Sequence, residues 1–73
     1  MIARKAASTP ATVKRQNTIL AYLANGWRLK EIAQELGVST QTLHHDMVAV
    51  RRRFDAATNE QAVAVAVRSG VIQ

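Results

Sequence analysis

Two adjacent histidines are followed at short spacing by three consecutive arginines, so residues 41–53 carry the densest set of side chains able to contact a ligand. Glutamine and histidine hydrogen-bond to base edges in the DNA major groove, valine contacts the thymine methyl group, and arginine pairs with phosphate. At about 100° per residue, a helix would turn six of these side chains outward: Gln41, His44, His45, Val48, Arg51 and Arg52. The pattern therefore indicates a surface that contacts DNA.

Other chemistries fit these residues less well. His44, His45 and Asp46 are potential metal ligands, but adjacent helical residues diverge by about 100° and cannot converge on one ion. We expect Asp46, which lies on the shoulder nearest the core, to pair with a basic side chain of another helix. The acidic residues form no paired site: they are Glu31, Glu35, Asp46, Asp55 and Glu60. We therefore predict no enzymatic activity, no cofactor and no metal.

The inner side of the same segment has the apolar spacing of a helix that packs on a core. Offsets of four, three and four residues return to nearly the same helical angle, and the residues concerned are Leu43, Met47, Val50 and Phe54. Ser39 is a preferred N-cap residue. The spacing predicts a helix over residues 40–54.

A shorter amphipathic helix is predicted over residues 29–36, with Leu29, Ile32, Ala33 and Leu36 on its buried stripe. Gly37 follows, and glycine adopts the left-handed conformation that ends helices. Two short helices joined by one tight glycine turn are typical of a helix-turn-helix motif.

A preceding helix is predicted over residues 10–25. Thr9 and Pro10 form a favourable cap and first turn, apolar residues recur at helical spacing, and Asn25 with Gly26 supplies a stop. We expect Tyr22 and Trp27 to pack in the core rather than to stack on bases.

The last helix is predicted over residues 59–69, from Thr58 and Gln61, which form a capping-box pattern, to Gly70. Its interior is apolar on every side, so it should be covered both by the core and by something else. We assign Ala62, Val63, Ala66 and Val67 to the core side. We assign a dimer interface to Gln61, Val65 and Arg68.

The composition agrees with a small DNA-binding protein. Ten Lys or Arg residues against five Asp or Glu residues give a net charge of +5 in 73 residues, which favours a polyanionic partner. So small a domain has a modest core, and there is no cysteine to reinforce it, so we expect a homodimer.

Residues 1–9 are interpreted as a flexible basic arm preceding one domain over residues 10–73. The longest apolar run has six residues, so we expect no membrane segment and a cytoplasmic protein at the nucleoid.

Three blocks of residues form a recognisable pattern between Val13 and Ile72: Ile19, Leu20, Leu23, Ala24 and Gly26; Lys30 to Ala33, Leu36 to Ser39, Thr42 and Leu43; and Gln61 to Val63 with Gly70 to Ile72. On these residues the chain resembles the DNA-binding domain of LuxR-type regulators, which include GerE-like single-domain proteins and FixJ-like response regulators.

The resemblance implies four helices, the third lying in the major groove and the fourth forming a two-fold dimer on DNA. It places the family's base-contacting positions on His44, His45 and Val48, and its phosphate-contacting positions near Thr40, Gln41 and Arg52. Five positions depart from the family pattern: Gln16 and Thr18 replace an acidic pair, Arg28 a small capping residue, Gln41 a lysine, and Asp46 a histidine. Base preference is therefore not transferred.

We interpret the chain as an all-α, sequence-specific regulator of transcription, from a bacterium or a phage, that binds double-stranded DNA. The base-contacting residues are predicted to be Gln41, His44, His45 and Val48. The phosphate-contacting residues are predicted to be Lys30, Thr40, Arg51 and Arg52, with Arg4 and Lys5 of the arm. Two alternatives remain: a helix-turn-helix scaffold that binds a regulatory protein, as sigma-like or anti-repressor modules do, and an accessory DNA-binding factor in phage recombination.

Overall fold

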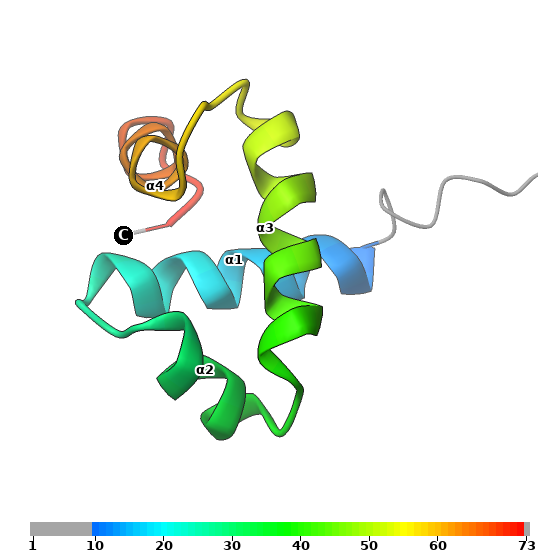
Figure 1. Ribbon diagram of the computed structural model, residues 1–73. Coiled ribbons are helices and arrows are strands. Elements are labelled where there is room, and N and C mark those ends of the chain that lie inside the picture. The colour runs from blue at the N-terminus through cyan, green and yellow to red at the C-terminus, as the bar shows by residue number, and fades with distance from the viewer. Residues whose placement is uncertain (1–9, 73) are drawn as a thin grey trace, which may run out of the picture.

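The computed structural model describes residues 10–72, which contain four α-helices and no β-strand (Figure 1). The helices are α1 (Pro10–Ala24), α2 (Leu29–Leu36), α3 (Thr40–Arg53) and α4 (Asn59–Arg68). The predicted all-α fold is confirmed, and each helix boundary agrees with its predicted range to within one residue. The predicted arm, with Arg4 and Lys5, lies outside the described residues.

Helices α1 and α3 organise the domain, since each of them contacts the other three helices. In Figure 1, α3 crosses α1, with α4 toward the carboxyl-terminal end of α3 and α2 toward its amino-terminal end. The segment after α4 returns between α4 and α1. This arrangement buries one side of α3 against the other three helices.

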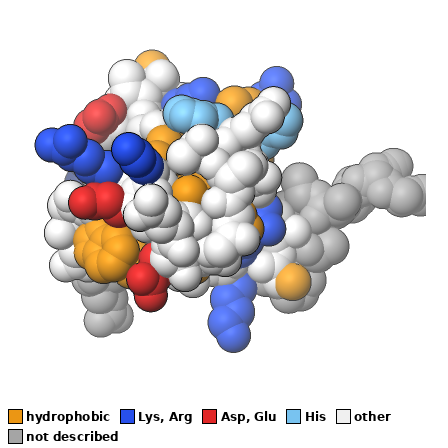
Figure 2. Space-filling view, turned by 60° about the horizontal axis from the view of Figure 1, so that its bottom comes forward, with side chains coloured by type: hydrophobic (Ala, Val, Ile, Leu, Met, Phe, Trp, Pro, Cys, Tyr) orange, Lys and Arg blue, Asp and Glu red, His pale blue; other side chains and the backbone are white. Residues whose placement is uncertain are grey.

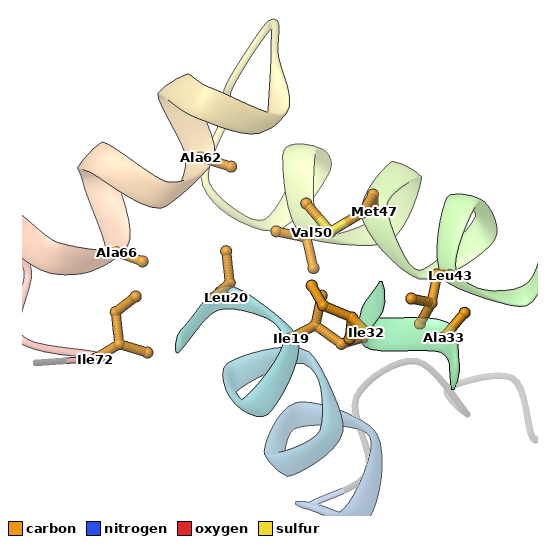
Figure 3. Close-up of a cluster of buried hydrophobic side chains, with 10 residues drawn as sticks. All are labelled: Ile19, Leu20, Ile32, Ala33, Leu43, Met47, Val50, Ala62, Ala66 and Ile72. Atoms are coloured by element: carbon orange, nitrogen blue, oxygen red, sulfur yellow. The ribbon is translucent and has the colours of Figure 1, made fainter. Parts of the chain in front are cut away.

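The core is a single cluster of buried apolar side chains drawn from all four helices and the final segment (Figure 3). Its members are Ile19, Leu20, Ile32, Ala33, Leu43, Met47, Val50, Ala62, Ala66 and Ile72. The inner stripe predicted for α3 is confirmed at Leu43, Met47 and Val50, which are fully buried. Phe54 is only partly buried, because it stands at the C-cap where the helix ends.

The turn between α2 and α3 forms as its sequence predicts. Gly37 has φ +71°, and the amide of Val38 donates to the carbonyl of Ala33 at 3.0 Å. These are the left-handed residue and the longer hydrogen bond of a Schellman helix end. Ser39 Oγ then accepts from the amide of Thr42 at 3.0 Å and so caps α3. The turn is fixed at both ends by local hydrogen bonds.

One residue of α4 differs from its assignment by sequence. Ala62 and Ala66 are fully buried, Val63 and Val65 are both half-buried, and Val67 is 46% exposed. Val63 packs against the core and Val65 is not among the residues that do, so the core-side assignment holds for Ala62, Val63 and Ala66 and was wrong for Val67. An alternating run of alanine and valine has no helical period in hydrophobicity, so its sequence does not distinguish a buried face.

The cap of α4 also differs in one hydrogen bond. Thr58 Oγ1 accepts from the amide of Gln61 at 3.0 Å, as predicted, but Gln61 Oε1 accepts from the amide of Ala57 at 2.6 Å. The returning bond thus reaches the residue before the N-cap. It fixes the end of the α3–α4 connection as well as the helix.

Trp27 corrects another prediction. Tyr22 packs partly buried against the core, but Trp27 is 37% exposed and lies with its ring centroid 4.5 Å from that of Tyr22. The chain has already left α1 at Gly26, whose φ is +90°, so Trp27 does not continue the helical stripe. The ring covers Tyr22 from outside instead of filling the core.

Leu20→Ala should lower the free energy of unfolding by about 2–5 kcal/mol, because a fully buried leucine is lost and a cavity remains. Val67→Ala removes an exposed side chain and should change it by less than about 0.5 kcal/mol. Urea unfolding followed by circular dichroism measures both. Equal losses for the two variants would contradict the observed orientation of α4.

Candidate nucleic-acid interface

The outward side of α3 presents the predicted base-contacting residues to solvent. Gln41, His44, His45 and Val48 are all exposed, and Val48 has 40% of its surface accessible. Thr40 and Arg52 are exposed on the same helix. Figure 2 shows the two histidines at one edge of the molecule beside Lys or Arg side chains, while the acidic side chains in this view lie away from them. An exposed helix with this lining has the dimensions and donors that fit a major groove.

The three arginines at the end of α3 have three different environments. Arg51 is half-buried, and its Nη1 donates to Asn59 Oδ1, at the start of α4, at 2.5 Å. Arg52 is exposed, and its guanidinium has no hydrogen-bond partner among residues 10–72. Arg52 is therefore the member of this run whose guanidinium is fully available to a ligand.

Arg53 faces α1. Its Nη1 donates to Gln16 Oε1 and to Asn17 Oδ1, each at 3.0 Å, and its guanidinium carbon lies 4.6 Å from the centroid of the Phe54 ring. Gln16 is 3% exposed, so its amide oxygen needs an internal partner, and Arg53 supplies one. This contact anchors the carboxyl-terminal end of α3 to α1.

A second contact anchors the middle of α3 to α1. Arg15 Nη2 donates to Asp46 Oδ1 at 2.7 Å, with the Asp46 side chain 11% exposed and that of Arg15 47% exposed. Asp46 Oδ2 is buried without a partner. The prediction that Asp46 pairs with a basic residue of another helix is confirmed, and the pair lies on the flank of α3 away from Val48.

The remaining predicted residues lie on other helices. Lys30 is exposed on α2, Gln61 and Arg68 are exposed on α4, and Val65 is half-buried there. The contacts of Gln16, Asn17 and Asn59 were not predicted, because polar residues at these positions give no sequence signal of a partner on another helix. Each of these contacts can be identified only once the positions of the helices are known.

Two open pockets of the described residues lie on other parts of the surface. One is lined by Leu23, Asn59, Glu60 and Val63 and the other by Asn25, Gly26, Trp27 and Glu31. Neither contains a residue of the exposed side of α3. Within residues 10–72, three or more His, Asp or Glu side chains never gather as a metal site would require, and no helix is long and apolar enough to cross a membrane.

Comparison with known proteins gives one match. Residues 10–66 match the family model GerE, described as bacterial regulatory proteins of the luxR family. The matched range contains α1, α2, α3 and most of α4. No curated protein and no solved structure matches the chain.

Arg15→Ala should lower the free energy of unfolding by about 1–3 kcal/mol, because the buried carboxylate of Asp46 loses its hydrogen-bonded cation. Adding Asp46→Asn should recover part of the loss, since a neutral amide costs less to bury than a charge. Lys14→Ala, the adjacent exposed cation, is the control and should be nearly neutral. Thermal and urea unfolding measure all three; equal effects of Arg15→Ala and Lys14→Ala would contradict this role for the pair.

Proposed function

The chain belongs to the luxR family of bacterial regulatory proteins, and we propose that it is a sequence-specific regulator of transcription that places α3 in the major groove of double-stranded DNA. The family is one of DNA-binding regulators and not a class of enzymes. Such a protein acts on the nucleoid in the cytoplasm.

The observation that carries the proposal is the division of α3 into two sides. Leu43, Met47 and Val50 are fully buried on the inner side, whereas Val48 and His45 are exposed on the outer side. Val48 is 40% exposed and so adds little to the core. The same valine is well suited to contact a thymine methyl group.

In this proposal the contacts divide into two kinds. Base edges are contacted by Gln41, His44, His45 and Val48. Phosphates are contacted by Arg52, Thr40 and Lys30, and by Arg4 and Lys5 of the amino-terminal segment. Phosphate contacts set register and affinity, while base contacts set sequence preference.

We further propose that two copies bind a two-fold site through α4. Gln61, Ala64 and Arg68 are exposed on this helix, and Val67 adds an apolar side chain that is 46% exposed. Val65, half-buried, would form the edge of the interface. A modest core and an exposed apolar helix face both favour association.

Arg52→Ala should weaken binding to every duplex by a similar factor and lower the slope of log affinity against log salt by about one, because one phosphate contact is lost. Arg52→Lys keeps the charge and should keep the slope. Fluorescence anisotropy across a salt series, on a selected duplex and a scrambled duplex, measures both. An unchanged slope for Arg52→Ala would rule out the phosphate contact.

His45→Ala and Val48→Ala should change which bases are preferred, since they remove groups proposed to contact base edges. Sequence selection from a random duplex library, repeated for each variant, gives the preferred site directly. If both variants select the wild-type site unchanged, these residues do not contact bases. If the wild type selects no sequence and binds no duplex, the protein-binding alternative takes precedence.

Val67→Glu should convert a complex of two chains per duplex into one chain per duplex, because an added carboxylate on each α4 would repel its counterpart across a two-fold interface. Ala24→Glu adds the same charge at the exposed end of α1 and should leave the stoichiometry unchanged. Sedimentation velocity with the selected duplex measures the stoichiometry. A wild-type complex with a single chain would refute the dimer.

A further inference from the structure

We infer that Arg51, which the sequence predicted to contact phosphate, is instead a positioning residue that holds α4 at a fixed orientation to α3. The inference rests on the proposed function, since its consequence is the spacing between two α3 helices on DNA. It assigns neighbouring arginines, Arg51 and Arg52, to different tasks.

Arg51 closes the α3–α4 connection with both its backbone and its side chain. Its carbonyl accepts from the amide of Ala56 at 2.8 Å, across Asp55, whose φ of +52° lies in the left-handed region. Its guanidinium donates to Asn59 Oδ1 at 2.5 Å, in the first turn of α4. One residue thus fixes the start and the end of the five-residue connection.

Local hydrogen bonds also restrict the backbone at the end of the α3–α4 connection. Ala57 donates its amide to Gln61 Oε1, and Thr58 Oγ1 accepts from the amide of Gln61, so the residues before α4 are bonded to the helix itself. The hydrogen bond from Arg51 to Asn59 is the side-chain link that joins this capped unit to α3. Without it, α4 keeps its cap but loses this tie to α3.

The hydrogen bond between Arg51 and Asn59 is important because α3 and α4 make different contacts in the proposed complex. If α4 sets the two-fold axis and α3 enters the groove, the angle between them sets the distance between half-sites. A dimeric helix-turn-helix protein discriminates half-site spacing through this geometry. Arg51 is half-buried beside Asn59, whereas Arg52 is exposed and its guanidinium has no internal partner, so of these two arginines only Arg52 is left for phosphate.

The test uses the full chain and two probes: the selected duplex, and the same duplex with one base pair inserted between its half-sites. The wild type should bind the lengthened duplex at least about tenfold more weakly. In Arg51→Ala this penalty should fall below about threefold with no change in the salt slope. Asn59→Ala removes no charge and should reproduce both results, and the double variant should be no worse than either one.

Arg52→Ala is the matched control and should do the opposite, lowering the salt slope by about one while keeping the spacing penalty. Circular dichroism at the assay temperature establishes that each variant is folded. If Arg51→Ala does not fold, Asn59→Ala still tests the inference, because it removes the same hydrogen bond. A slope lowered by one in Arg51→Ala, with Asn59→Ala unchanged from wild type, would make Arg51 a phosphate contact and overturn the inference alone. A wild type that binds without sequence preference, or as a single chain, would overturn the proposed function and the inference with it.

Discussion

Burial of Leu43, Met47 and Val50 along one stripe of α3 is the constraint on which the other features depend. The stripe holds α3 against α1, α2 and α4 at once, so the helix has no freedom to rotate and its outer side is fixed by default. Exposure of His45 and Val48 therefore follows from the packing of their neighbours. In a chain of 73 residues, one helix has to supply both a large part of the core and the contact surface.

Apolar packing fixes the inner side of α3, and polar contacts to α1 fix the position of its flanks. On one flank Arg15 meets Asp46 and Arg53 meets Gln16, so α1 is tied to α3 at two points along its length. These are hydrogen bonds with a charged partner, which are stronger and more directional than neutral ones. They also satisfy side chains that packing has removed from water, namely Gln16 and one oxygen of Asp46. Orientation of α3 and satisfaction of buried polar groups are achieved by the same contacts.

The sequence predicted the elements whose signals are local. Gly37 and Ser39 fix the turn through contacts within five residues, and a spacing of three and four residues identifies the inner side of α3. Prediction failed where the local signal was absent: Val67 is exposed although it is as apolar as Val63, which packs against the core, and Trp27 lies beyond the end of α1. The hydrogen bonds between α1 and α3 join residues 31 to 37 positions apart, and periodicity in one sequence carries no information on such pairs. Asp46 was an exception because a carboxylate near a core needs a cation wherever the cation comes from.

Helical geometry explains why a run of like residues does not act as a unit. Neighbouring side chains diverge by about 100°, so His44, His45 and Asp46 cannot share a metal ion, and Arg51, Arg52 and Arg53 point to different surroundings. The surroundings of each arginine set its role. Arg51 contacts α4, Arg52 faces solvent and Arg53 contacts α1. Two of the three guanidiniums thus anchor α3 to neighbouring helices, and that of Arg52 has no internal partner in the described part of the chain. Because the partners of Arg51 and Arg53 are neutral amides, both arginines keep their positive charge, so the whole run contributes to the positive potential at this end of α3.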